Sequence, residues 1–263
     1  MTTSSKINTR SNQWYGWLPD LPDHRDLKYA KIAPRLKTLP PLVNLQPLCP
    51  PVEDQGSLGS CTANALVGAL EYLTKKDGAP FVDLSRLFVY YNERVIGGTV
   101  MEDSGAFLRD GIKTLAKQGV CTEATWPYAT DAKTFTKKPS KSCYTAAKKH
   151  QILSYHRINT GAEMRTCLAD GYPFVFGFTV YESFESSQVA KTGTLKLPKK
   201  TESVVGGHAV LAVGYDDSKK QFLVRNSWVE SWGKKGYFTI PYSYLEDRNL
   251  SDDFWTIRAA EQG

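Results

Sequence analysis

The stretch Gln55-Gly56-Ser57-Leu58-Gly59-Ser60-Cys61 places a cysteine directly before an apolar repeat. The repeat has helical spacing, which predicts a helix beginning near Cys61 and stopping at Gly78. A cysteine that opens a helix meets the positive end of the helix dipole, and this favours the nucleophilic thiolate. Gln55 lies just upstream, and we expect its side-chain amide to join the Cys61 backbone N–H in binding a developing oxyanion.

Two further groups of residues downstream carry the other parts of a nucleophilic site. His208 follows two glycines at the head of an apolar strand. Asn226, in Arg225-Asn226-Ser227-Trp228, ends a second strand, and Asp216-Asp217 predicts a hairpin turn between the two strands. Neighbouring strands lie about 5 Å apart, so Asn226 would reach His208 and fix its ring orientation. Trp228 would shield that hydrogen bond from water.

Each of these residues also has a plain structural interpretation. A cysteine before a helix is commonly a buried structural residue, and a histidine on an apolar strand is commonly a core residue. Asn226 could simply cap a turn. The three together, in this order along the chain, indicate a Cys-His-Asn catalytic site.

The predicted elements change in kind along the chain. Two more helices are predicted, at about 85–94 and 105–117, and the character changes to strands after about Ser154. The strands are predicted at Phe174–Val180, Ala209–Tyr215, Gln221–Val224 and Tyr237–Ile240. Helices followed by strands are typical of an α+β fold with two segregated halves.

The composition indicates an ordinary globular protein of 263 residues, 41% hydrophobic and 23% charged, with a net charge of +6. No stretch approaches the roughly 18 consecutive apolar residues of a membrane span. The densest basic stretch, between Lys133 and Lys149, lacks the interleaved aromatic residues of a nucleic-acid groove, and we interpret it as a solvated loop. We therefore expect a monomer that binds neither nucleic acid nor membrane.

The termini and cysteines leave some questions open. The polar start, Met1 to Ser11, is not expected to act as a signal peptide. The compartment is left unknown from sequence, and we lean to a secreted or periplasmic location. Five cysteines suit one catalytic thiol plus up to two disulfides. We expect Cys167 to be a buried free thiol, and a disulfide between some pair among Cys49, Cys121 and Cys143 is plausible.

The sequence resembles the papain-like, or cathepsin-like, cysteine peptidases, most of all their bacterial branch. The resemblance covers about Leu42 to Ile257 and rests on eight short motifs in order: Pro51-Val52-Glu53-Asp54-Gln55-Gly56, Gly59-Ser60-Cys61, Trp126-Pro127-Tyr128, Gly207-His208-Ala209-Val210, Gly214-Tyr215, Asn226-Ser227-Trp228, Trp232-Gly233 and Gly236-Tyr237. It implies a papain-like two-lobed α+β fold, with a helical left half, an antiparallel β-barrel-like right half and the active-site cleft between them.

The resemblance also implies an activity and a domain plan. It implies hydrolysis of peptide bonds in protein or peptide substrates through Cys61, His208, Asn226 and an acyl-enzyme, with Gln55 assisting and no cofactor or metal. It implies a peptidase domain over 38–263, with a mainly helical lobe at about 48–153 and a mainly β lobe at about 154–257. We favour endopeptidase action, because no His-His insertion resembling the occluding loop of the exopeptidase branch is present.

Further positions are carried over from the family. Its substrate-binding Gly-Gly aligns with Gly105-Ala106, which makes Ser104 and Gly105 neighbours of the substrate, and Trp228 is also placed in the substrate site. Gly177 and Gly207 align with the second specificity pocket, and two glycines favour large apolar side chains there. Three positions depart from the family's animal and plant pattern without removing a catalytic group: Leu58 where a cysteine is usual, Thr62 where an aromatic is usual, and Val229 where glycine is usual.

The N-terminal arm, residues 1–37, differs from the longer helical prosegment that family members carry across the cleft in reverse and remove on activation. Pro19 and Pro22 block a regular helix in this arm, and Trp14 and Trp17 suggest that it packs onto something. We hypothesise that residues near Trp14 to Asp26 cover the cleft as a short inhibitory prosegment. The alternative is a strap packed on the barrel away from the cleft.

Overall fold

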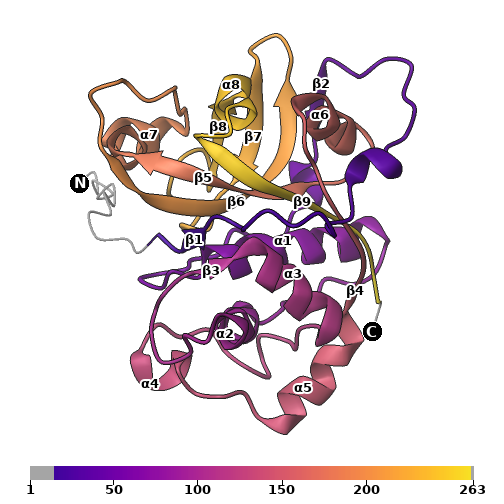
Figure 1. Cartoon of the computed structure of the whole chain (residues 1–263), viewed down its shortest axis with the longest axis vertical. Helices are drawn as coiled ribbons and strands as arrows, with labels where there is room; N and C mark the ends of the chain where they lie inside the picture. The colour runs from indigo at the N-terminus through magenta and orange to yellow at the C-terminus, as the bar shows by residue number, and fades with distance from the viewer. Residues whose placement is uncertain (1–14, 262–263) are drawn as a thin grey trace, which may run out of the picture.

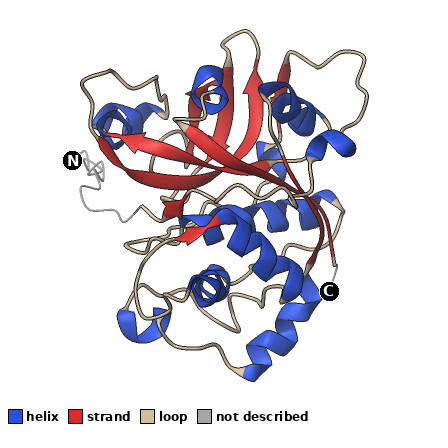
Figure 2. Cartoon of the chain, in the orientation of Figure 1, coloured by secondary structure: helices blue, strands red, loops and turns tan. Residues whose placement is uncertain are grey.

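The computed structural model describes residues 15–261 and divides them into a helical half and a half dominated by one sheet (Figure 1, Figure 2). The polar start of the chain and Trp14, the first tryptophan of the arm, lie outside the described residues. The α+β fold class with two segregated halves is confirmed.

Five α-helices make up most of the helical half: α1 (Cys61–Lys76), α2 (Arg86–Gly97), α3 (Leu108–Lys117), α4 (Ala132–Phe135) and α5 (Lys141–Ala147). The first helix begins at Cys61, as predicted. It ends just before Gly78, whose φ of 81° is a conformation that glycine adopts without steric cost. Short 3-10 helices lie at Tyr29–Lys31, Gln46–Leu48, Lys148–His150 and Glu182–Glu185.

The sheet half contains seven strands that pair antiparallel. The main order is β4 (Ile152–Arg157), β9 (Ser251–Ala260), β5 (Phe174–Tyr181), β6 (Val204–Asp216), β7 (Gln221–Arg225) and β8 (Tyr237–Pro241), and β2 (Leu42–Asn44) pairs with β6. Helices α6 (Gly161–Ala169), α7 (Ser187–Thr192) and α8 (Tyr242–Glu246) belong to this half.

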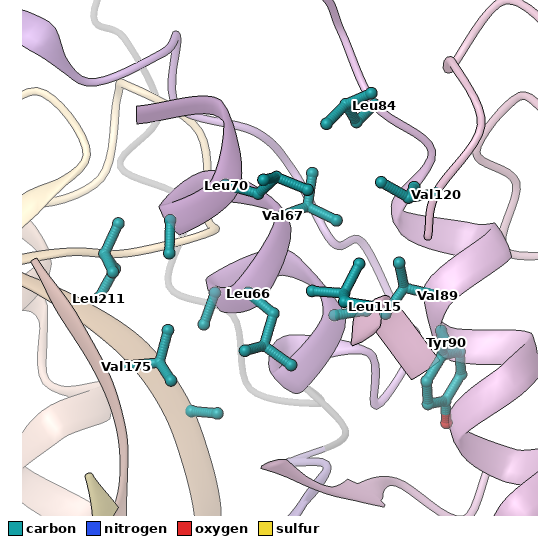
Figure 3. Close-up of a cluster of buried hydrophobic side chains, with 14 of the residues drawn as sticks. Leu66, Val67, Leu70, Leu84, Val89, Tyr90, Leu115, Val120, Val175 and Leu211 are labelled. Atoms are coloured by element: carbon teal, nitrogen blue, oxygen red, sulfur yellow. The ribbon is translucent and has the colours of Figure 1, made fainter. Parts of the chain in front are cut away.

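Helix α1 lies between the two halves and is therefore buried from Cys61 to Leu73. Its apolar side chains pack on the sheet on one side and on α2 and α3 on the other. Figure 3 labels several of them: Leu66, Val67 and Leu70 of α1, Val175 and Leu211 of the sheet, and Val89 and Leu115 of α2 and α3. The line along which α1 faces β5 and β6 is called the seam below.

Two differences from the predicted elements have clear physical causes. The third helix begins at Leu108 instead of residue 105, because Ala106–Phe107 form strand β3, which pairs in parallel with β1 (Trp17–Leu18) of the arm. Strand β9 was not predicted. Its centre, between β4 and β5, is almost continuously buried, so its sequence lacks the alternation that marks a half-exposed strand.

The sequence predicted a solvated loop for the lysine-rich stretch. The stretch instead carries α4, α5 and a 3-10 helix. Its lysines are nevertheless exposed to solvent on these short elements. Within residues 15–261, no helix is long and apolar enough to cross a membrane.

All five cysteines are free thiols, so the disulfide considered from sequence is not formed. Cys121 and Cys143 are the pair in contact, since their thiols hydrogen-bond to each other. Cys49 instead lies beside Arg225 and Tyr237, in the sheet half. Cys167 is a buried free thiol, as predicted.

Candidate active site

Cys61 is fully buried at the first position of α1, on the seam. Burial raises the pKa of its thiol to about 11, while backbone N–H groups of Ala209 and Gly16 hydrogen-bond the sulfur and act in the opposite direction. One of these N–H groups belongs to β6 and the other to the arm. The sulfur is therefore enclosed by α1, the sheet and the arm.

His208 reaches the seam from β6, one residue before Ala209. Its Nε2 lies 2.8 Å from Asn226 Oδ1, the contact expected from the β6–β7 hairpin. Trp228 stacks on the imidazole, with ring centroids 4.9 Å apart and an interplanar angle of 27°. Nδ1 has no hydrogen-bond partner among the described residues, so the ring is held through Nε2 while its other nitrogen is free to exchange a proton.

The protonation state of Cys61 differs from the thiolate expected from sequence. Burial lowers the pKa of His208 to about 4, although the Asn226 hydrogen bond acts in the opposite direction. With the pKa of Cys61 raised, both groups are neutral near pH 7 in this arrangement. Desolvation outweighs the helix dipole here, because the arm and the two halves exclude water from the thiol and the imidazole.

Gln55 is almost completely buried, at 1% exposure, and its amide orientation is fixed by three hydrogen bonds. Its Oε1 accepts from Ser227 Oγ at 2.7 Å and from Trp228 Nε1 at 3.2 Å. Its Nε2 donates to the Leu58 carbonyl at 2.9 Å. An amide nitrogen has two hydrogens, so one N–H of Gln55 is left for a ligand beside Cys61.

Gly105 and Ala106 are engaged by the arm, whereas Ser104 is not. The Ala106 N–H donates to the Gly16 carbonyl at 2.7 Å. Gly105 has a φ of 72°, and a Cβ there would lie 2.3 Å from the Gly16 carbonyl oxygen. Ser104 hydrogen-bonds Thr99 at 2.7 Å and so faces its own loop. The backbone edge predicted to pair with substrate is thus occupied by residues of the same chain.

Gly177 and Gly207 together make room for Trp17. A Cβ at Gly177 would lie 1.9 Å from the Trp17 ring, and one at Gly207 would lie 2.6 Å from the Trp17 carbonyl oxygen. The indole N–H donates to Asp253 Oδ2 at 3.0 Å. Trp17 is 7% exposed, so the space beside these glycines is filled by the arm.

Tyr15 covers the imidazole from the arm side. Its ring centroid lies 5.9 Å from that of His208 and 6.1 Å from that of Trp228. Its hydroxyl donates to Glu185 at 2.8 Å. Tyr15, Gly16 and Trp17 together therefore lie over the histidine, the cysteine and the two glycines.

Several residues at this site were not predicted from sequence. Asp103 accepts the Gly59 N–H at 3.0 Å and thereby ties the loop before Cys61, close to where Leu58 departs from the family's cysteine. Arg109, Arg157 and Asp253 hold the arm beyond Trp17. They come from separate elements, α3, β4 and β9, and no local motif connects them.

Comparison with known proteins identifies the family of the chain. Residues 44–251 match the family described as papain family cysteine protease. An uncharacterized peptidase C1-like protein of Acanthamoeba polyphaga mimivirus is 40% identical, over 93% of this chain and 86% of its own. Cysteine proteinase 3 of Entamoeba histolytica is 27% identical, over 80% of this chain and 66% of its own.

A crystal structure of xylellain, a cysteine protease from Xylella fastidiosa, superposes with a TM-score of 0.85 at 44% identity, covering 94% of this chain and 97% of that one. A procathepsin B from Trypanosoma congolense has the same fold, with a TM-score of 0.75 at 18% identity, over 95% of this chain and 87% of that one. The chain belongs to the papain family of cysteine proteases and has the two-lobed papain-like fold.

Proposed function

We propose that this cysteine peptidase is an endopeptidase in which Cys61, His208 and Asn226 perform catalysis, Gln55 assists, and the N-terminal arm inhibits. The hydrogen bond between His208 Nε2 and Asn226 Oδ1 carries the catalytic part of the proposal. It fixes a buried imidazole on β6. The next residue on that strand, Ala209, donates its backbone N–H to the Cys61 sulfur. The hydrogen bond to Asn226 also leaves Nδ1 as the nitrogen that can take the thiol proton.

The proposed reaction proceeds through an acyl-enzyme. His208 accepts the Cys61 proton at Nδ1, and the thiolate attacks the carbonyl carbon of a peptide bond. The second Nε2 hydrogen of Gln55 and the Cys61 backbone N–H stabilise the tetrahedral oxyanion. His208 then gives its proton to the departing amine, and a water activated by the same imidazole releases the acyl group from Cys61.

The inhibitory part of the proposal rests on the position of Tyr15–Trp17. These residues cover both reacting groups and occupy the Ala106 edge and the space beside Gly177. The Gly16 N–H hydrogen-bonds the Cys61 sulfur, so the arm offers the nucleophile a donor at that point. A bound segment of this kind excludes substrate and, by keeping water out, also keeps the thiol protonated.

Substrate preference follows from the space that Trp17 fills. The two glycines that accommodate an indole support selection of large apolar or aromatic side chains in this pocket. This agrees with the expectation from the family alignment.

The catalytic assignment is tested on the full chain carrying Gly16→Val, which should displace the arm, with a dipeptidyl fluorogenic substrate and with a denatured protein. We expect Cys61→Ala to lower turnover at least about 1,000-fold. Cys167→Ala is the matched control, because Cys167 is also a fully buried free thiol but lies in the sheet half, outside the site. An irreversible thiol-directed epoxide should label Cys61. Labelling elsewhere, or an active Cys61→Ala variant, would contradict the assignment, and cleavage only at chain ends would contradict endopeptidase action.

A further inference from the structure

Arg109 lies on the first turn of α3. Within the described part of the chain, every hydrogen bond that its guanidinium donates goes to the arm. Nε and Nη2 donate to the two carboxylate oxygens of Asp26, at 3.1 and 2.8 Å, and Nη1 donates to the Leu21 carbonyl at 2.7 Å. With the arm in place, Arg109 is only 9% exposed. Its binding partners are thus the very residues that must move when Cys61 is uncovered.

Arg157, on β4, is shared between the arm and the body of the protein. Its Nη1 lies 3.3 Å from both Asp20 and Asp26 of the arm. Its Nη2 lies 2.7 Å from Asp253 and 3.1 Å from Asp252, on β9. Departure of the arm would leave one side of this guanidinium paired and the other open.

The carboxyl group of Asp20 lies fully buried among three donors, with the Asp253 carboxylate nearby. Its Oδ1 accepts the backbone N–H of Arg109 at 3.2 Å, at the N-terminus of the ten-residue helix α3. Its Oδ2 accepts from Trp255 Nε1 at 3.2 Å and from Arg157. A helix N-terminus, an indole N–H and a guanidinium that converge on one side chain form a site for an acidic group.

Removal of the arm changes the charge balance of this site. The arm takes away the carboxyl groups of Asp20 and Asp26, while Arg109 and Arg157 stay in the body of the protein. Arg109 then keeps no carboxylate partner among the described residues, because its ion pairs are with Asp20 and Asp26 only. Two guanidinium groups beside the N-terminus of α3 then lack the arm's carboxylates, so the open enzyme attracts an anion at this position.

We propose that Arg109 and Arg157, with the indole N–H of Trp255, form a substrate-binding site that selects an acidic side chain in the open enzyme. The proposal rests on the proposed function, since it requires the arm to leave and a peptide to follow the same path. Asp20 and Asp26 of the arm occupy the position that an aspartate or glutamate of the substrate would take.

The arm also indicates where in a substrate the acidic residue belongs. From Cys61 outward, Gly16 touches the sulfur, Trp17 fills the space beside Gly177, and Asp20 reaches the arginines. Asp20 is three residues beyond Trp17, and three extended residues span about 10 Å. The acidic residue of a substrate should therefore lie three positions farther from the scissile bond than the residue that fills the space beside Gly177.

The test uses two fluorogenic peptides, acetyl-Asp-Ala-Ala-Phe-Ala and acetyl-Asn-Ala-Ala-Phe-Ala, each with an aminocoumarin leaving group. The enzyme is the full chain carrying Gly16→Val, Asp20→Asn and Asp26→Asn, which displaces the arm and leaves the arginines without its carboxylates. We expect kcat/KM for the Asp peptide to exceed that for the Asn peptide about tenfold at low salt, and the ratio to fall as salt rises.

Variants assign the effect to the proposed site. Arg109→Gln or Arg157→Gln, added to the same chain, should bring the Asp to Asn ratio close to one. Lys113→Gln is the matched control, since Lys113 lies one turn farther along α3, is exposed, and pairs with Asp110 outside the cluster. If the triple variant does not fold in a thermal unfolding assay, Trp17→Ala with Asp20→Asn and Asp26→Asn on native Gly16 serves instead, because it removes the indole that fills the space beside Gly177.

The outcomes separate the two proposals. A ratio near one in the chain with a displaced arm, or a tenfold ratio that survives Arg109→Gln, overturns the acidic-site proposal. Failure to hydrolyse either peptide overturns the proposed peptidase function, on which the acidic-site proposal depends. Hydrolysis of both peptides with a ratio that depends on both arginines supports the two proposals together.

Discussion

Two consecutive parts of the arm hold to the protein by different physical means. The blocking segment, residues 15–18, contacts the seam through shape: glycine against glycine backbone, and an indole against two glycines. The anchoring segment, residues 20–26, contacts the body of the protein through charge: two carboxyl groups against two arginines. We therefore expect the first segment to determine whether Cys61 is accessible, and the second to respond to ionic conditions.

The contacts made by the blocking segment and by the anchoring segment differ in how strongly they depend on a single added or lost atom group. A Cβ at Gly16 would lie 1.7 Å from the Gly59 carbonyl oxygen, and neither backbone can yield without moving the loop before Cys61. In the anchoring segment, each arginine keeps a second partner when one carboxylate is lost. Buried ion pairs also recover little net energy after desolvation. The largest effects are therefore expected in the blocking segment.

Gly16→Val should release the blocking segment and give the largest change. The valine side chain overlaps the Gly59 carbonyl, and a penalty of about 3 kcal/mol or more corresponds to roughly a hundredfold shift of the docking equilibrium. We expect kcat/KM of the full chain on a dipeptidyl substrate to rise by that order.

The matched control for this prediction is Gly97→Ala, at the end of α2, where a Cβ meets only Thr99 at an ordinary 3.6 Å. That variant should keep the activity of the unaltered chain. If Gly16→Val stays as inactive as the unaltered chain while it remains folded, steric blocking at Gly16 is wrong.

The pH dependence should separate the two segments by sign. The covered site lowers the pKa of His208 to about 4 from its ordinary 6.5, so protonation favours the uncovered state. Docking is then strongest above pH 6.5 and loses about 3 kcal/mol as pH falls towards 4. For Asp20, burial and the nearby Asp253 raise the pKa, so docking gains stability as pH falls below that raised pKa.

The two contributions oppose each other in the unaltered chain and should nearly flatten its response to acid. Asp20→Asn removes the opposing contribution, so Cys61 of this variant should become more accessible, about tenfold or more, as pH falls from 6.5 to 4.5. The measurement is the initial rate of Cys61 labelling by a pH-insensitive thiol epoxide at each pH, with Gly16→Val as the reference for an uncovered site. Equal pH profiles for the Asp20→Asn and unaltered chains would contradict the assignment.

The same two segments show what the sequence could and could not predict. Cys61, His208, Asn226 and Gln55 could be predicted as site residues because each sits in a local motif whose turn residues and spacing carry chemical meaning. Trp17 was predicted to lie near the active site, because an aromatic residue in a polar, proline-broken arm needs a place to pack. The family alignment supplied Gly177 and Gly207, but not what fills the space beside them.

The anchoring cluster was missed for a physical reason. Arg109 and Arg157 are 48 positions apart, on a helix and a strand, and only the tertiary fold brings them to the same carboxylates. The pKa of Cys61 was predicted in the wrong direction for a similar reason. A helix dipole is visible in a local pattern, whereas burial under a distant segment depends on the whole fold.

Trp17→Phe should give a smaller change than the loss of Gly16. Phenylalanine keeps most of the ring contact with the glycines but loses the indole N–H bond to Asp253. The Asp253 oxygen keeps the Asp20 N–H at 2.7 Å, so the cost is that of one hydrogen bond to a charged acceptor, about 1.5 kcal/mol. We expect the full chain to become roughly tenfold more active on the dipeptidyl substrate.

Trp126→Phe is the control for this substitution. Trp126 also loses its indole N–H, but that group has no hydrogen-bond partner among the described residues, and Trp126 lies in the helical half. Its activity should stay within about twofold of the unaltered chain. A Trp17→Phe variant that behaves like this control would mean that the Asp253 contact adds nothing to inhibition.

Asp26→Asn should have the smallest effect and the clearest dependence on salt. The substitution removes the charge that faces Arg109 and Arg157, but the new amide keeps an oxygen that can accept one of their hydrogen bonds. Both side chains of the Asp26–Arg109 pair are 11% exposed, and a largely buried pair recovers little net energy after desolvation, so activity should rise only about threefold at low salt, and less at high salt. Asp23→Asn is a control within the same segment, because Asp23 pairs only with Arg25 of the arm itself. If both variants respond equally, charge in the arm acts through its general field, and the specific contact with Arg109 is not what anchors it.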